Sequence, residues 1–185
     1  MCKKNIKCKL GMIKINKDKG ILFWITGLSG SGKTTLGKKI KKNITKAYGP
    51  TIMISGDDIR KIFKLKGYTY KDRYEVVMKY CKLSKFITSQ NINVIFAVVG
   101  MMNSVRNWNR KNIKNYVEIY IKSDLKKIIK KGKKRIYHQN IDNIIGLDIK
   151  AEYPKKPDII LHSNFKKDIS NYAAELVTKI REYIN

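Results

Sequence analysis

Five short apolar runs recur along the chain, and the stretches between them carry apolar residues at helical spacing. The runs are mostly rich in β-branched and aromatic residues, which is typical of buried strands. They cover residues 21–26, 51–55, 93–99, 116–121 and 158–163. Strands that alternate with helices are joined by right-handed crossovers and form a mainly parallel sheet. The pattern therefore predicts an α/β fold, a three-layer sandwich in which helices cover both faces of a five-stranded sheet.

Two helices between or after these strands are predicted most clearly. Apolar residues from Ile169 to Tyr183 recur at helical spacing and leave Lys179 and Arg181 on other faces, so this helix packs on the sheet. A second amphipathic helix is expected over residues 71–89. In a parallel sheet of this kind, ligands bind at the carboxyl ends of the strands.

The length of 185 residues suits one compact domain, and no linker or internal repeat divides the chain. The longest apolar run, at 94–102, is too short to cross a bilayer. The first twenty residues are basic but have no apolar core of the kind that a secretory signal requires. We therefore expect a soluble, cytoplasmic protein with one domain over 1–185, in which 1–19 form a basic extension. Its three cysteines are too scattered for a disulfide framework.

The formal charge of +27 is the most unusual bulk property. Such a field attracts nucleic acid, anionic lipid or phosphorylated small molecules. Lysines are spread along the whole chain, and Ile and Asn are also abundant, which favours codon bias in an A+T-rich genome over nucleic-acid binding. The chain also lacks a separate basic arm and interleaved aromatic residues. We therefore expect a small-molecule partner, and neither a membrane nor a nucleic acid; only 126–135 is densely cationic.

The stretch GLSGSGKTT, residues 27–35, lies between the first predicted strand and a predicted helix. It satisfies G-x-x-x-x-G-K-[ST], whose glycines let the backbone aim successive N–H groups at phosphate oxygens. Lys33 adds a mobile charge, and the Thr34 hydroxyl is placed to ligate the Mg²⁺ that bridges the outer phosphates. A plain glycine–serine turn is the alternative, which the complete motif at this junction disfavours. The residues expected to bind ATP are Gly27, Ser29, Gly30, Ser31, Gly32, Lys33, Thr34 and Thr35.

The end of the second predicted strand, SGDDIRKIF at 55–63, carries two carboxylates and an arginine. Asp57 is placed to hold Mg²⁺ or to take the proton from an attacking hydroxyl, and Arg60 to clamp an anionic acceptor. The alternative is a helix start, where aspartate is common, and both interpretations can hold together. We therefore predict Asp57 and Lys33 as catalytic residues, with Thr34 and Asp57 at the metal.

Five segments resemble the adenylylsulfate kinase family in their order along residues 20 to about 163. They are WITGLSGSGKTTL, SGDDIRKIF, GYTYKDR, NVIFAVV and IIGLD followed by YPKKPDIIL. The resemblance implies a P-loop kinase that transfers the γ-phosphate of ATP to a ribose 3′-hydroxyl and forms a homodimer. It also implies that Arg60 and Arg73 hold the acceptor, and that about 124–150, with Lys134, form a lid. A solvated helix face is the alternative for the individual lysines of that segment.

The departures from the family concentrate where the acceptor should bind. Gly100 replaces a serine, Ile144 replaces a phenylalanine that stacks on the acceptor base, and Val76 replaces an asparagine of the acceptor pocket. Ser55 and Asn103 replace an aspartate and an arginine. Loss of an aromatic platform costs roughly 1–3 kcal/mol of stacking per base. That is enough to change which base is preferred.

These departures, together with RNWNRKNIKNY at 106–116, resemble a divergent branch of the family, the cytidine diphosphoramidate kinases associated with capsule polysaccharide modification. The expected acceptor is cytidine diphosphoramidate or adenylyl sulfate. Another small-metabolite or nucleoside kinase with the same phosphate loop stays open, as does a nucleic-acid-binding NTPase. The NTPase is disfavoured because no glutamine or arginine finger is evident. The residues expected to bind the acceptor are Arg60, Arg73, Gly100, Lys134 and Ile144.

Overall fold

The computed structural model describes residues 15–16, 18–130 and 143–184. Five strands and six helices follow one another along these residues. They are β1 (Leu22–Thr26), α1 (Lys33–Tyr48), β2 (Thr51–Ser55), α2 (Gly56–Ile62), α3 (Tyr70–Ser89), β3 (Asn93–Val98), α4 (Asn103–Asn112), β4 (Tyr116–Ser123), α5 (Leu125–Lys130), β5 (Ile159–Ser163) and α6 (Ile169–Ile184). All five predicted strands and both predicted helices are confirmed.

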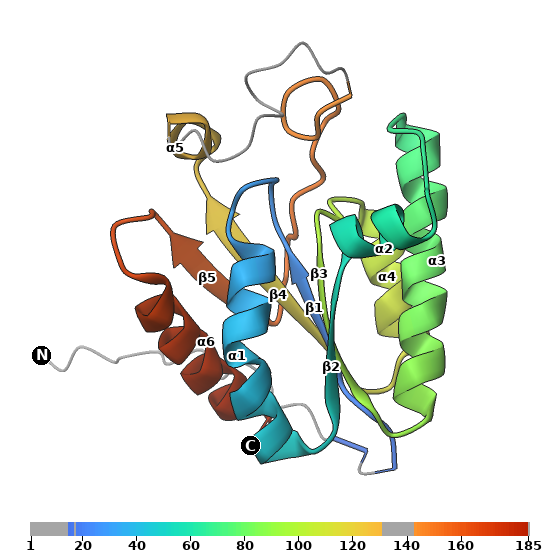
Figure 1. The fold of residues 1–185 in the computed structure, drawn as a ribbon, viewed down its shortest axis with the longest axis vertical. Helices are drawn as coiled ribbons and strands as arrows, with labels where there is room; N and C mark the ends of the chain where they lie inside the picture. The colour runs from blue at the N-terminus through green and yellow to red at the C-terminus, as the bar shows by residue number, and fades with distance from the viewer. Residues whose placement is uncertain (1–14, 17, 131–142, 185) are drawn as a thin grey trace, which may run out of the picture.

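The strands form one sheet in the order β2-β3-β1-β4-β5, and every neighbouring pair is parallel (Figure 1). The predicted α/β three-layer sandwich is therefore confirmed, with a sheet that is parallel throughout. β1 lies at the centre, and its Trp24 pairs with Phe96 of β3 on one side and Glu118 of β4 on the other. All carboxyl ends meet at one edge, where β1 leads into α1 and β2 leads into α2 (Figure 1).

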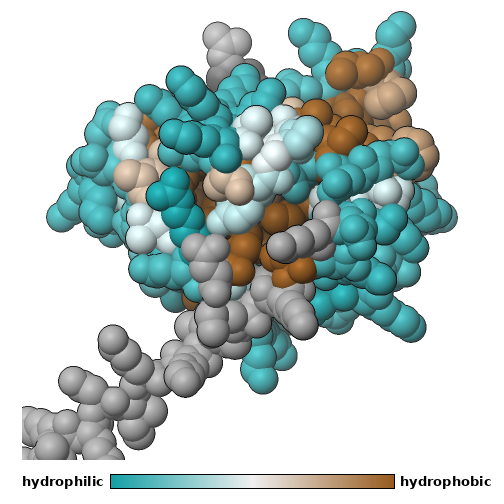
Figure 2. Space-filling model, turned by 90° about the horizontal axis from the view of Figure 1, so that it is seen from below, coloured by the Kyte–Doolittle hydropathy of each residue, from teal (hydrophilic) through white to brown (hydrophobic). Residues whose placement is uncertain are grey.

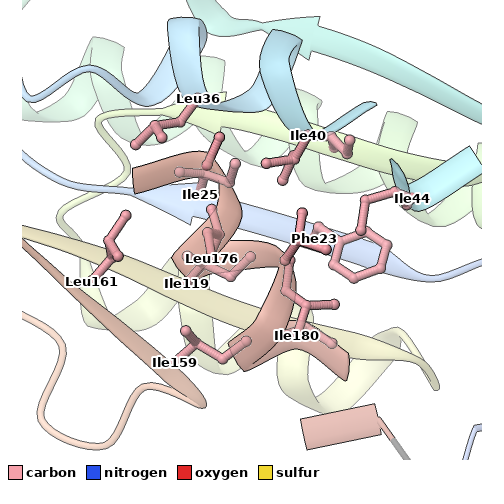
Figure 3. Close-up of a cluster of buried hydrophobic side chains, with 14 of the residues drawn as sticks. Phe23, Ile25, Leu36, Ile40, Ile44, Ile119, Ile159, Leu161, Leu176 and Ile180 are labelled. Carbon is pink, nitrogen blue, oxygen red and sulfur yellow. The ribbon is translucent and has the colours of Figure 1, made fainter. Parts of the chain in front are cut away.

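Helices α1 and α6 cover one face of the sheet. Figure 3 shows their apolar side chains directed at the central strands, with Leu36 and Ile40 from α1 and Leu176 and Ile180 from α6. Each of these four side chains is at most 1% exposed. Burial of a side chain of this size contributes about 1.5–3 kcal/mol, so this layer holds α1 firmly against β1.

Helices α3 and α4 cover the other face. Tyr80 of α3 stacks on Phe96 of β3 with ring centroids 5.1 Å apart, and Trp24 lies in the same cluster. Cys81 is fully buried there, as expected, and burial raises the pKa of its thiol to about 12. Trp108 of α4 packs against this cluster, and the Lys85 ammonium lies 5.9 Å from its ring centroid. Both tryptophans are therefore packing residues of this layer.

The surface at the amino ends of the strands is mostly hydrophilic, with brown apolar residues confined to smaller areas (Figure 2). Exposed lysines of α1, among them Lys38, Lys41 and Lys46, contribute to the positive charge of the molecule. Within the described part of the chain, no helix is both long enough and apolar enough to cross a membrane.

Candidate active site

A cavity of about 510 Å³ lies at the carboxyl edge of the sheet. Its walls come from the loop after β1, the starts of α2 and α3, the loop after β3, residues 144–145 and the loop after β5. The predicted site residues that line it are Ser29, Gly30, Ser31, Gly32, Lys33, Thr34, Thr35, Asp57, Arg60, Arg73, Gly100 and Ile144. Lys134 lies outside the described residues. Residues separated by more than 100 positions in the sequence thus share one cavity.

The loop after β1 presents a helix start without a side-chain cap. Gly32 occupies the N-cap position of α1 with φ 91° and ψ 8°, a left-handed conformation that glycine adopts readily. The Lys33 ammonium donates a 2.7 Å hydrogen bond to the carbonyl oxygen of Leu28. Among the described residues, the buried Ser31 hydroxyl finds no hydrogen-bond partner. Phosphate oxygens can accept hydrogen bonds from the N–H groups of this uncapped helix start and from the Ser31 hydroxyl.

Gly27, the first residue of the motif, does not line the cavity. A Cβ at this position would lie 2.7 Å from the carbonyl oxygen of Ile121. Gly27 is therefore needed for the close approach of the loop to β4, and in this structure it contributes no surface to the cavity.

At the start of α2, the residue that caps the helix is not the carboxylate that is predicted to be catalytic. Ser55 is the N-cap, and its hydroxyl accepts a 3.4 Å hydrogen bond from the backbone N–H of Asp58. Asp57 lies in the first turn, exposed and facing the cavity that Thr34 also lines. The helix-start interpretation is therefore confirmed in part, because Asp57 and Asp58 lie in the first turn of α2 while Ser55 is the N-cap.

Tyr80 fixes the backbone next to Asp57. Its buried hydroxyl donates a 3.0 Å hydrogen bond to the carbonyl oxygen of Gly56. Burial raises the pKa of Tyr80 to about 12, so the hydroxyl stays protonated and remains a donor at neutral pH. The sequence places Tyr80 on the core face of α3 but gave no sign of this contact.

The oxygen ligands around the phosphate loop fit Mg²⁺. Hydroxyl and carboxylate oxygens, as on Thr34 and Asp57, are the hard ligands that this ion prefers, and it keeps several bonds for phosphate and water. Among the described residues, no three His, Cys, Asp or Glu side chains form a metal-holding group. An all-protein metal cage is thus absent from this part of the chain, and a phosphate-dependent site is what the residues allow.

Two arginines flank a tyrosine at the other end of the cavity. The guanidinium carbons of Arg60 and Arg73 lie 4.6 Å and 5.2 Å from the ring centroid of Tyr68. Burial, aided by the charge of Arg60, lowers the pKa of Arg73 from its usual value. Two neighbouring positive charges in a partly buried site favour an anionic ligand.

Arg73 also joins two segments of the cavity wall. Its Nε donates to the carbonyl oxygen of Tyr68 at 2.9 Å, and its Nη2 donates to that of Asn143 at 2.7 Å. Arg73 thereby holds the Tyr68 loop beside the segment that carries Ile144. Sequence reasoning missed Tyr68, which is 49% exposed and lines the cavity. The sequence feature that could have pointed to Tyr68 is its position just before the Thr69–Asp72 capping box that starts α3.

Val76 does not contribute to the cavity, and the expectation that it lies in the acceptor pocket is wrong. Its side chain is 5% exposed and packs in the core between α3 and the sheet. The cavity-facing residues of α3 are Arg73, Val77 and Tyr80, which are spaced three or four positions apart and share one face of the helix. Val76 borders that face, but its side chain packs into the core and does not reach the cavity.

The comparisons with known proteins agree with this geometry. Residues 19–162 match the family model described as adenylylsulphate kinase. The chain belongs to the adenylylsulfate kinase family. It is an ATP-dependent phosphotransferase, a nucleotide kinase of the adenylylsulfate kinase type.

Relatives of this kinase span nearly its whole length. A cytidine diphosphoramidate kinase of Campylobacter jejuni is 31% identical over 89% of this chain and 98% of its own. An adenylyl-sulfate kinase of Halothermothrix orenii is 26% identical over 92% and 96%. The APS kinase of Mycobacterium tuberculosis in complex with AMPPNP and APS has the same fold, with a TM-score of 0.78, 21% identity and coverage of 88% and 98%.

Proposed function

We propose that this kinase transfers the γ-phosphate of ATP to the ribose 3′-hydroxyl of a nucleotide. The observation that carries the proposal is the single cavity that unites the phosphate loop, the Asp57 carboxylate and the Arg60–Arg73 pair. Phosphoryl transfer needs a charged cradle, a base or metal-linked carboxylate and a held acceptor, and these three parts supply them.

The donor half follows from the loop after β1. The amides at the start of α1 and the Ser31 hydroxyl bind phosphate oxygens, and Lys33 moves its ammonium from the Leu28 carbonyl to the transferring group. Thr34 and Asp57 would hold Mg²⁺, and the bound ion would supply positive charge against the phosphates. Asp57 accepts the proton of the attacking hydroxyl.

The acceptor half lies on the β2 side of the phosphate loop. Arg60 and Arg73, which lie against the Tyr68 ring, hold the anionic part of the acceptor, and the Ile144 side chain lines the part of the cavity that encloses its base. An aliphatic side chain gives less stacking area than an aromatic ring does. This favours a small pyrimidine, and the similarity to the Campylobacter jejuni enzyme supports cytidine diphosphoramidate as the acceptor.

Adenylyl sulfate is the second candidate acceptor. It is favoured by the family model over residues 19–162 and by the adenylyl-sulfate kinases among the relatives. The same catalytic groups serve either acceptor because the 3′-hydroxyl and the phosphate donor do not change. Only the contacts around the base and the terminal group differ.

The proposal includes the setting of this activity. We propose one domain over residues 1–185 as the working unit, with 1–19 as an extension and about 124–150 as a lid, acting as a cytoplasmic homodimer. Light scattering of the purified chain tests the dimer directly, because a monomer and a dimer differ twofold in mass.

The deciding experiment is a transfer assay with purified protein. Mg·ATP is incubated with cytidine diphosphoramidate or with adenylyl sulfate, and the product nucleotide is located by ³¹P NMR. We expect a new 3′-phosphate on cytidine diphosphoramidate, with a higher kcat/KM than on adenylyl sulfate. The reverse preference would move the assignment to the second candidate, and turnover of neither would refute both.

A further inference from the structure

Arg106 of α4 is a buried cation with contacts to three parts of the molecule. It is 3% exposed, and its Nε lies 3.2 Å from a carboxylate oxygen of Glu118 on β4. Its Nη1 donates to the carbonyl oxygen of Gly100 at 3.1 Å, and its Nη2 donates to that of Glu152 at 2.7 Å. A guanidinium can make several hydrogen bonds in fixed directions, which suits a residue that joins segments.

Glu152 extends these connections through its carboxylate and its backbone. One carboxylate oxygen accepts from the backbone N–H of Asn103 at 2.6 Å, at the start of α4. The other accepts from the hydroxyl of Tyr70 at 3.2 Å, at the start of α3. Its own N–H donates to the carbonyl oxygen of Met101 at 3.0 Å. Glu152 thus contacts the loop after β3, the start of α4 and the start of α3, once each.

The connected segments are those that form the proposed acceptor half of the cavity. The loop after β3 contributes Gly100, α3 contributes Arg73, and the segment that ends at Glu152 contributes Ile144. Neither Arg106 nor Glu152 lines the cavity itself. Any effect of these two residues on the acceptor must therefore pass through the segments that they hold.

We propose that Arg106 and Glu152 are positioning residues for the acceptor. Together they hold the loop after β3, the start of α3 and residues 144–152 as one unit around the acceptor, whereas neither has a hydrogen bond to the phosphate loop among the described residues. The proposal rests on the proposed function in so far as this half of the cavity receives the acceptor.

Arg110 provides a matched control within the same helix. Its guanidinium lies 3.2 Å from Glu118 and 3.1 Å from Asp158, so it shares one ion-pair partner with Arg106. It has no hydrogen bond to the cavity-lining segments among the described residues. Arg110→Lys therefore perturbs the same buried carboxylate without releasing the acceptor side.

The test compares Arg106→Lys, Glu152→Ala and Arg110→Lys by hydrogen exchange and by kinetics. In Arg106→Lys the ammonium keeps the charge but cannot reach all of the partners, and in Glu152→Ala the two carboxylate contacts are lost. We expect exchange over 99–103 and 144–153 to become about tenfold faster or more in both variants, the effect of losing hydrogen bonds to a charged group. Exchange over 27–36 stays unchanged, and Arg110→Lys leaves all three regions unchanged.

The kinetic arm uses the acceptor that the wild-type enzyme turns over. The KM for this acceptor should rise about tenfold or more in the first two variants, while the KM for ATP stays at the wild-type value. Equal changes in both KM values, or exchange that matches Arg110→Lys, would overturn the proposal. If the wild type transfers phosphate to neither candidate acceptor, the proposed function fails. The hydrogen-exchange measurements then still show whether Arg106 and Glu152 hold these segments together.

Discussion

Gly100 offers a direct test of how tightly the acceptor side of the cavity is built. It adopts φ +44°, and an added Cβ would lie 3.2 Å from Cγ1 of Val98 and 3.3 Å from Cζ2 and Nε1 of Trp24. The left-handed backbone costs a residue with a Cβ about 1–2 kcal/mol. Contacts this short in a packed core add about 1–3 kcal/mol, since neither neighbour can move freely.

The change Gly100→Ala should therefore destabilise the protein by about 3 kcal/mol. For a chain of this size the Tm should fall by roughly 6–12 °C, measured by calorimetry or circular dichroism. The carbonyl of Gly100 accepts from Arg106, so relief of the strain by a backbone shift would also move the cavity wall. The KM for the acceptor should rise while the KM for ATP does not.

Gly49→Ala is the control for this prediction. Gly49 also has a positive φ, +93°, but a Cβ there would meet nothing within 4 Å, and the residue follows the end of α1 that is remote from the cavity. It should lower the Tm through backbone strain alone and leave both KM values unchanged. If Gly100→Ala shifts the Tm by less than 2 °C, or if Gly49→Ala changes the acceptor KM equally, the reasoning about Gly100 is wrong.

Three further predictions concern single side chains. Lys33→Ala should lower kcat by about 10²–10³ through loss of a charge near the transferring phosphate, with an unchanged circular dichroism spectrum; a wild-type rate would contradict the assignment. Asp57→Asn should keep ATP binding, measured with a fluorescent ATP analogue, yet lower kcat by about 10²–10⁴, as expected for a proton acceptor or metal ligand; full activity would place the base elsewhere. Because burial raises the pKa of Cys81 to about 12, its thiol stays protonated at pH 8. In a Cys2→Ser, Cys8→Ser background it should react with a disulfide reagent only after denaturation, and rapid labelling of the native protein would show that the site is open.

The fold could be predicted from the sequence because its main signals are local. Each strand is a run of five to eight residues whose apolar character is visible without its neighbours, and α6 has an apolar stripe along its whole length. The phosphate loop is equally local, since β1, residues 27–35 and α1 follow one another without interruption. Prediction of the phosphate loop therefore needed no knowledge of the rest of the chain.

The acceptor half was harder to predict because distant residues meet there through backbone atoms. Arg73 binds the carbonyl oxygen of Asn143, and Arg106 binds those of Gly100 and Glu152. Every residue has a backbone carbonyl group, so neither the spacing nor the composition of the sequence predicts which carbonyls accept these hydrogen bonds. The error at Val76 has a related cause, since the family pattern gave the position but not the burial of its side chain in the core.

This division between the two halves explains how such an enzyme can change its acceptor and keep its chemistry. In the proposed function, Lys33, Thr34 and Asp57 of the donor half act on the phosphates and the proton, so these side chains must not change. The acceptor half is held together largely through main-chain carbonyls, which remain acceptors when side chains change, provided that the backbone keeps its conformation. Ile144 can therefore differ from the family pattern while the wall keeps its shape, whereas a side chain at Gly100 would move the wall. Substitutions on this wall should alter the choice of nucleotide well before they alter the transfer of phosphate.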